Sequence, residues 1–171
     1  EQKGLLRLLE VHRDLLKNNL KHNIYIAGDG PLKDKLNEKI NEYGVSNSFV
    51  LLGSKINPYP YMKKADVIIA QAGHSTAMEI LSMGKPSIIV PDLNQIEQEN
   101  NAKRMAELQV SEVITHKHLT PQKMFDCIQK VMKDEKYKKN AKFFATMSEE
   151  MDAKKKVAEI LTEYSMRLHR Y

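Results

Sequence analysis

The 171-residue sequence is poor in several features, and each shortage excludes a class of protein. Its single cysteine, Cys127, cannot form an internal disulfide, and no signal-like apolar run opens the sequence, so we expect a reduced, cytoplasmic setting. It contains no run of about 18 apolar residues, and a membrane-spanning segment is therefore not expected. Tryptophan is absent and aromatic residues make up only 6%, which argues against the stacking surfaces that bind single-stranded nucleic acids or RNA.

The excess of positive charge is small and mostly local. Lysine and arginine total 27 against 22 acidic residues, a net charge of +5, and residues 133–171 supply 10 and 7 of these, or +3. We interpret this segment as a solvated helical surface and expect no nucleic-acid partner. The alternative is peripheral attraction to anionic phospholipids at the inner face of a membrane, at about 1 kcal/mol per well-placed lysine.

Helical and strand patterns alternate along the whole sequence. Short apolar runs predict five strands, at residues 24–27, 49–53, 67–70, 87–90 and 110–114. A helical pattern separates each strand from the next, and this alternation is typical of a parallel sheet covered by helices on both faces. We predict an α/β fold and one domain over residues 1–171, a Rossmann-like parallel sheet of about five to six strands with terminal helices from about residue 135 to 171.

In such sheets ligands bind beyond the carboxyl ends of the strands, where the loop after the third predicted strand has the features of a phosphate site. Gly73 lets backbone amides approach a ligand, and Ser75 and Thr76 add hydroxyls at the start of a helix, whose unpaired N–H groups attract anions. Glu79, one turn later, is suited to accept hydrogen bonds from ribose hydroxyls. The alternative is a purely structural capping box, in which Glu79 folds back on the backbone of Thr76.

A second polar loop, residues 92–101, follows the fourth predicted strand. Its Glu97 and Gln98 pair a carboxylate, which accepts hydrogen bonds, with an amide, which both donates and accepts. This pairing suits sugar hydroxyls, although a polar loop of this kind is also common on solvated surfaces. Because the two loops follow neighbouring strands, we expect them to face one crevice.

Several familiar sites are excluded by their spacing. Gly28-Asp29-Gly30-Pro31 resembles a phosphate turn, but Lys33 replaces the third glycine of the dinucleotide motif. The sequence has no P-loop, and its histidines and carboxylates show no compelling metal-ligand spacing, so no metal site is predicted. We interpret His116-Lys117-His118 as an exposed loop.

Taken together, the motifs resemble the C-terminal, donor-binding half of a GT-B glycosyltransferase. In the first half of the sequence, the segments similar to retaining transferases are Lys3-Gly4 and residues 24–32, 49–53 and 61–67. In the second half, residues 72–80, 84–91 and 97–102 are similar to inverting UDP-glycosyltransferases, the lipid II N-acetylglucosaminyltransferase and the monogalactosyldiacylglycerol synthases.

The resemblance implies a role for each candidate residue. The nucleotide-binding set that it implies is Lys3, Gly28, Gly73, His74, Ser75, Thr76 and Glu79, in which Gly73, Ser75 and Thr76 hold the diphosphate, Glu79 the ribose, and Lys3 the leaving phosphate. Glu97 and Gln98 would contact the transferred sugar. Two positions depart from the plant-type pattern, since Gln71 stands where that pattern has a phosphate-binding histidine and His74 where it has another residue.

The function implied is transfer of a hexose or N-acetylhexosamine from a nucleotide sugar, a UDP-sugar by family likeness, to a lipid or glycan acceptor. No metal and no cofactor is required. The acceptor site and any general base would belong to an N-terminal domain or a partner chain, so the sequence alone would be incomplete for catalysis. Two alternatives remain open, a non-catalytic or split-transferase subunit that pairs with a separate acceptor-binding chain, and half of a nucleotide-sugar 2-epimerase.

Overall fold

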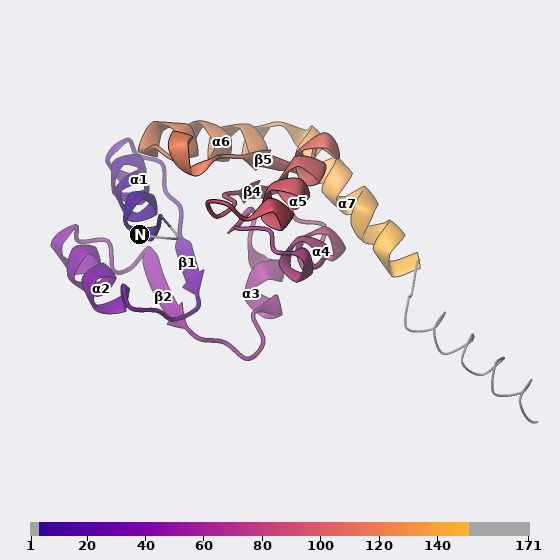
Figure 1. Ribbon diagram of the computed structural model, residues 1–171. Coiled ribbons are helices and arrows are strands. Elements are labelled where there is room, and N and C mark those ends of the chain that lie inside the picture. Colours follow the sequence, from indigo (N-terminus) through magenta and orange to yellow (C-terminus); the bar gives the residue numbers. More distant parts are fainter. Residues whose placement is uncertain (1–3, 151–171) are drawn as a thin grey trace, which may run out of the picture.

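The computed structural model describes residues 4–150, in which strands and helices alternate as predicted (Figure 1). The strands are β1 (Ile24–Ala27), β2 (Phe49–Gly53), β3 (Ile68–Ala70), β4 (Ser87–Ile89) and β5 (Ser111–Val113). The helices are α1 (Leu5–Lys17), α2 (Lys33–Glu42), α3 (Tyr59–Lys64), α4 (His74–Ser82), α5 (Ile96–Glu107), the short 3-10 helix η1 (His116–His118), α6 (Pro121–Lys133) and α7 (Glu135–Glu150). Lys3 and the predicted helical segment after residue 150 lie outside the described residues.

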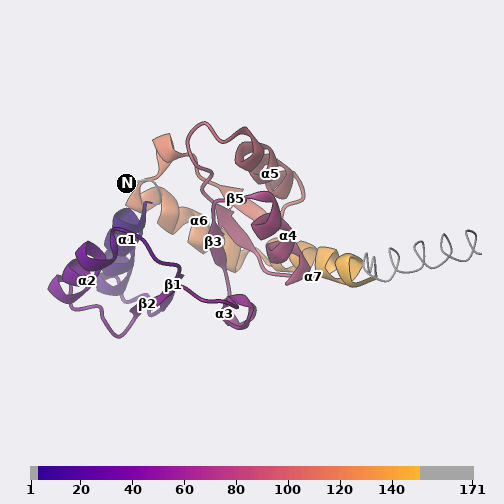
Figure 2. The ribbon, with the colours of Figure 1, turned by 60° about the horizontal axis from the view of Figure 1, so that its bottom comes forward.

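All strand pairs are parallel, as predicted, but the strands form two sheets instead of one. β1 pairs with β2, while β3, β4 and β5 form a three-stranded sheet in that order. The expected continuous sheet of five to six strands is therefore wrong for the described residues. Strands join a sheet only where they lie about 4.8 Å apart, and β1 and β3 share no ladder hydrogen bond; Figure 2 shows them apart.

Side-chain packing joins the two sheets where backbone hydrogen bonds do not. One buried cluster combines residues of α1, α2, β2, β4 and α6, including Leu9, Phe49, Ile88 and Val131. Helix α6 packs against α1, β4 and β5, and so bridges the two halves of the molecule (Figure 1). Burying one side chain of this size contributes about 1.5–3 kcal/mol of transfer free energy. The cluster contains several such side chains from both sheets and is therefore the main connection between them.

The opposite face of the three-stranded sheet carries a second cluster, from α4, α5 and α7. Its most buried members include Ile80, Ile89, Met105 and Val110. Ile88 belongs to the first cluster and Ile89 to the second because successive residues of a strand point to opposite faces. Helices therefore cover both faces of this sheet, as the alternating pattern predicts.

The ends of two helices show how local sequence fixes the packing. Thr120 caps α6 by accepting a hydrogen bond from the Lys123 backbone N–H (3.2 Å), with Pro121 at the first helical position, as predicted. Gly84, just beyond α4, has a φ of +63°, and a Cβ there would lie 3.1 Å from Cβ of Ala145. Glycine is thus required both for the turn and for the close approach of α7. None of the helices within residues 4–150 is long and apolar enough to cross a lipid bilayer.

Candidate functional site

The carboxyl ends of β3, β4 and β5 bring three polar segments to one edge of the sheet. The ladder continues one residue past the strands, because the Val90 N–H donates to the Ala70 carbonyl (2.8 Å) and the Ile114 N–H donates to the Ile89 carbonyl (2.9 Å). The segments that follow therefore leave the sheet side by side. Ligands of open parallel sheets bind at this edge, which makes it the candidate site.

The N-terminus of α4 is capped by a carboxylate from the first turn of α5. No side chain of its own loop caps the helix at Gly73, and instead the His74 N–H donates to Oε1 of Glu97 (2.8 Å). Ser75 is exposed and Thr76 half-buried in the first turn. A helix N-terminus attracts anions through its unpaired N–H groups and its dipole, so the position of Glu97 marks the place where an anionic oxygen is held. The two predicted loops meet here.

Hydrogen bonds hold both loops in place. Ala72 is fully buried in the left-handed conformation, with a φ of +61°, which costs a residue with a side chain about 1–2 kcal/mol. Nδ2 of Asn101 donates to the Ala72 carbonyl (3.0 Å) and so ties this strained turn to α5. In the second loop, Oε1 of Gln98 accepts from the Asp92 N–H (2.9 Å). Gln98 lies in the first turn of α5, which begins at Ile96 inside the predicted loop 92–101, and it holds the segment that precedes this helix.

Glu79 reaches across to α3 and does not fold back on the helix terminus. The Tyr59 hydroxyl donates to Oε1 of Glu79 (2.9 Å), and this hydrogen bond raises the pKa of Tyr59. The capping-box alternative is wrong, because α4 begins at His74 and Thr76 lies inside its first turn. A carboxylate and a phenol hydroxyl stand together here, a pair that can bind hydroxyl groups by both accepting and donating.

The remaining predicted nucleotide contacts are less closely grouped. Gly28 ends β1 with a φ of +130°, and its N–H donates to the Gly53 carbonyl (2.9 Å), so its loop belongs to the two-stranded sheet. Among the described residues no hydrogen bond links this loop to α4. His74 is exposed at the start of α4 and joins the site through its backbone, whereas Lys3 lies outside the described residues.

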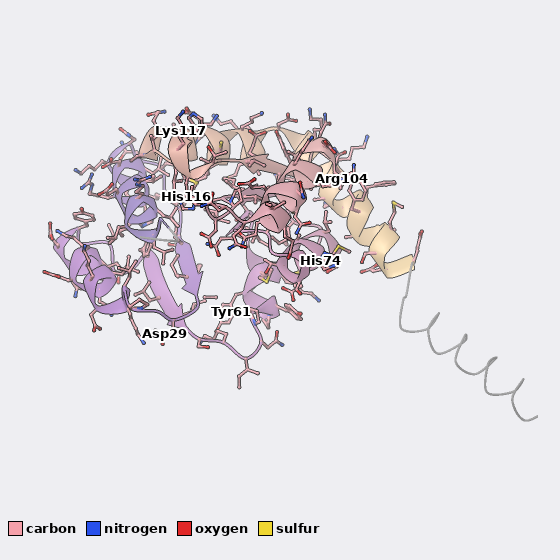
Figure 3. The ribbon with its side chains drawn as sticks, in the orientation of Figure 1. Asp29, Tyr61, His74, Arg104, His116 and Lys117 are labelled. Atoms are coloured by element: carbon pink, nitrogen blue, oxygen red, sulfur yellow. The ribbon has the colours of Figure 1, made fainter. Side chains whose placement is uncertain are left out.

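The sequence did not single out Tyr59, Asn101 or His116. The expectation of an exposed His116 is wrong, because its side chain is only 15% exposed. Its Nε2 is buried and lies 3.6 Å from Oδ1 of Asp92 (His116 is labelled in Figure 3). Lys117 and His118 are exposed, as expected. The pairing register of β4 and β5 is the signal that would have related His116 to Asp92. Asp92 and His116 each stand three residues beyond Ile89 and Val113, which face each other in the ladder.

Two carboxylates at this edge bind protein groups. Glu79 accepts from Tyr59 and Glu97 accepts from the α4 backbone. Within residues 4–150 no group of three or more histidine, cysteine or acidic side chains is arranged to hold a metal ion.

Comparison with known proteins identifies the family. Residues 2–161 match the family described as glycosyltransferase family 28 C-terminal domain. The chain belongs to this family. The family 28 domain thus confirms the resemblance that the motifs predicted, to the donor-binding half of a glycosyltransferase.

Individual relatives agree with this assignment. An uncharacterized glycosyltransferase of Methanosarcina mazei is 37% identical over 103 residues, which cover 60% of this chain and 27% of that protein. The UDP-N-acetylglucosamine–N-acetylmuramyl-(pentapeptide) pyrophosphoryl-undecaprenol N-acetylglucosamine transferase 2 of Bacillus thuringiensis is 24% identical over 142 residues, which cover 82% and 39%.

Among solved structures, Acinetobacter baumannii MurG superimposes with a TM-score of 0.70 at 20% identity, over 84% of this chain and 41% of that one, and shows the same fold. The family 28 domain spans 27–39% of the length of the curated relatives it matches.

Proposed function

We propose that this family 28 domain binds a UDP-sugar and forms the donor half of a glycosyltransferase. The observation that carries the proposal is the contact between Glu97 and the His74 N–H, which joins the predicted diphosphate and sugar loops at the N-terminus of α4. The similar Bacillus thuringiensis protein is named for a UDP-N-acetylglucosamine donor, which supports the choice of nucleotide.

The diphosphate would lie at the start of α4. There the backbone amides after Gly73 and the hydroxyls of Ser75 and Thr76 offer hydrogen bonds to an anion. The helix dipole alone contributes about 0.3–1 kcal/mol, whereas a millimolar ligand needs about 4 kcal/mol, so several contacts must act together. We assign Lys3, Gly28 and His74 as further contacts to the nucleotide.

Sugar recognition would divide between two groups. The Tyr59–Glu79 pair would hold the ribose hydroxyls, while Glu97 and Gln98 would contact the transferred hexose or N-acetylhexosamine. In the reaction, negative charge develops on the departing diphosphate, and preorganised N–H and hydroxyl donors at α4 would stabilise that charge. This requires no metal and no cofactor.

The acceptor, a lipid or a glycan, and any general base would be bound by an N-terminal domain or a partner chain. This places the family 28 domain as one of two parts of an enzyme, incomplete for transfer by itself. A match to a glycosyltransferase family does not favour the alternative of a 2-epimerase half.

The proposal is tested by calorimetric titration of the protein with UDP, GDP and ADP in parallel. We expect UDP to bind, and Glu79→Ala and Thr76→Ala each to weaken it about 5- to 30-fold, because each removes one or two hydrogen bonds to the ligand. Glu99→Ala, an exposed carboxylate on α5, is the matched control and should leave the affinity unchanged. No binding of any nucleotide by folded protein, or binding insensitive to both substitutions, would contradict the proposal.

We further propose peripheral attachment to the cytoplasmic face of a membrane through α7. Its lysines Lys136, Lys139 and Lys142 are exposed, and the ring of Phe143 beside them is 59% exposed. Such a surface is attracted to anionic headgroups. The protein should sediment with vesicles containing phosphatidylglycerol but not with pure phosphatidylcholine, and equal sedimentation with both would exclude the proposal.

A further inference from the structure

Two buried side-chain nitrogens lack a hydrogen-bond partner within residues 4–150, and both follow strands of the three-stranded sheet. They are Nε2 of Gln71, directly after β3, and Nε2 of His116, in η1 after β5. Proteins leave few buried polar groups unpaired, because each costs about 1–3 kcal/mol. Both atoms follow strands of one sheet, and a polar group bound at this edge would satisfy them.

Strand register places these residues at one edge of the sheet. Ala70 faces Ile89 in the ladder, so Gln71 stands opposite Val90, whose side chain lies in the core cluster beneath α1 and α6. Asp92 follows Val90 by two residues, beyond the end of β4. His116 stands in the same relation to Ile114, and its Nε2 is 3.6 Å from Oδ1 of Asp92. We call Gln71, Asp92 and His116, which follow the three neighbouring strands β3, β4 and β5, the strand-end cluster.

The strand-end cluster is flanked by the two loops of the proposed donor site and by the start of α1. Gln98 holds the Asp92 backbone, and the adjacent Glu97 caps α4. On the other side, η1 leads directly into Leu119, which packs so closely on Gly4 that a Cβ there would lie 2.6 Å from Cδ2 of Leu119. Figure 3 shows His116 between α1 and α5.

The chemistry of the cluster selects a neutral, hydroxyl-bearing ligand. The Asp92 carboxylate only accepts hydrogen bonds and repels phosphate, whereas the Gln71 amide nitrogen only donates. The 3.6 Å between His116 and Asp92 is too long for a direct hydrogen bond, but a hydroxyl can bridge the two. Neighbouring sugar hydroxyls can donate to Asp92, accept from Gln71 and pair with the imidazole in either tautomer.

We propose that the strand-end cluster binds hydroxyls of the donor's hexosyl unit and sets which sugar the protein prefers. The assignment rests on the proposed function, and it adds Gln71, Asp92 and His116 to the sugar contacts implied for Glu97 and Gln98. It also gives His116, on a segment distant in sequence from both loops, a role in specificity.

The test compares UDP with UDP-glucose, UDP-galactose and UDP-N-acetylglucosamine by calorimetric titration of the protein. The wild type should bind one UDP-sugar more tightly than UDP. His116→Ala and Asp92→Ala should each weaken that UDP-sugar about 5- to 30-fold and change UDP affinity less than about twofold, because only the sugar contacts are lost. Asp92→Asn should lose less than Asp92→Ala, since an amide oxygen still accepts a hydrogen bond. His118→Ala, an exposed histidine of the same turn, is the matched control.

The other outcomes are distinguishable. If both variants weaken UDP and UDP-sugars equally and lower the melting temperature, the cluster is structural and the assignment is overturned. Unchanged sugar affinity in both variants would mean that the cluster binds only water, which overturns it as well. If wild-type protein that is folded binds no nucleotide, the proposed function fails and this assignment fails with it, whereas UDP binding without sugar discrimination removes this assignment alone.

Discussion

Two polar clusters of this protein contain buried histidines, and they differ in whether the hydrogen-bonding groups are satisfied. At the amino ends of β1 and β2, His12 bonds through Nδ1 to Nε2 of His22 (2.8 Å) and through Nε2 to Oγ of Ser48 (2.8 Å). Nδ1 of His22 in turn bonds to the Leu20 carbonyl (2.9 Å). We call these residues the strand-start cluster, and every ring nitrogen in it has a partner.

The Leu20 carbonyl, at the end of the strand-start cluster, determines which atom donates in each of its hydrogen bonds. A carbonyl only accepts, so Nδ1 of His22 donates to Leu20, and the neutral ring then accepts at Nε2 from Nδ1 of His12. Nε2 of His12 accepts in turn from the Ser48 hydroxyl. Both rings are therefore satisfied in the neutral form. His12 is fully buried, and burial, followed by repulsion from His22, lowers its pKa to about 4.

The comparison indicates that the strand-start cluster is structural and that the strand-end cluster binds a ligand. The strand-start cluster satisfies its own groups and should affect folding alone. In the strand-end cluster, Nε2 of Gln71 and Nε2 of His116 lack a hydrogen-bond partner within residues 4–150, and the latter lies 3.6 Å from Asp92. Because this sheet edge is where ligands bind, the cluster should affect binding more than folding. Four substitutions or conditions test whether this division holds.

The largest effect is expected from opening the strand-start cluster. His12→Ala removes the partner of Nε2 of His22, leaves the Ser48 hydroxyl only the Val45 carbonyl (3.3 Å) and creates a cavity against Phe49. The free energy of unfolding should therefore fall by about 3–4 kcal/mol. Urea denaturation measures this loss. The exposed variant His118→Ala should lose less than about 0.5 kcal/mol. A loss below about 1 kcal/mol for His12→Ala would show that the closed network contributes little to folding.

Lowering the pH should destabilise the strand-start cluster without any substitution. The folded-state pKa of His12, about 4, lies below its ordinary value of 6.5, so between these values the unfolded chain binds a proton that the folded chain does not. Stability should therefore fall as the pH drops from about 6.5 to 4, with a His12 contribution of about 2 kcal/mol already lost at pH 5. Urea midpoints at pH 7 and pH 5 measure this, and His12→Gln should remove that part of the difference. An identical pH dependence in that variant would rule out His12 as its source.

A smaller effect is expected at the strained turn of the binding edge. Asn101→Ala removes the hydrogen bond to the Ala72 carbonyl, which should cost about 1 kcal/mol of stability and weaken UDP binding severalfold, since Ala72 precedes the α4 terminus. Asn100→Ala, its exposed neighbour, is the control for both thermal melting and titration. Loss of stability with UDP affinity intact would separate the turn from the nucleotide site.

The smallest effect, and one of opposite sign, is expected from Glu97→Gln. The carboxylate occupies the α4 terminus where the diphosphate is proposed to bind, so removing its charge should raise UDP affinity about two- to fivefold, equivalent to the dipole contribution of about 0.3–1 kcal/mol. Titration with UDP measures it, with Glu99→Gln as the matched control on the same helix. Weaker UDP binding in Glu97→Gln would mean that the carboxylate positions the terminus and does not compete with the ligand.

Much of the local structure was predictable from the sequence because it depends on neighbouring residues. The five strands were placed within a residue or two, and Thr120-Pro121 marked the start of α6. The same reasoning predicted one sheet and, as an alternative for Glu79, a capping box that begins at Thr76. Both were wrong. A hydrophobic pattern identifies a strand but carries no information on which strand edges pair. The capping pattern likewise does not show that α4 begins earlier, with its cap at Gly73, three residues before Thr76.

The sequence by itself determined the alternation of strands and helices, the polar loops after β3 and β4 and the resemblance to a glycosyltransferase donor domain, because each depends on residues close together in the chain. Only the tertiary structure decided which distant groups meet. The His74 backbone and Glu97 are 23 residues apart, Tyr59 and Glu79 are 20 apart, and Asp92 meets His116 only because β4 and β5 pair in a fixed register. The physical reason is that hydrogen bonds act over about 3 Å, and only the packing of helices and sheets determines which side chains come that close.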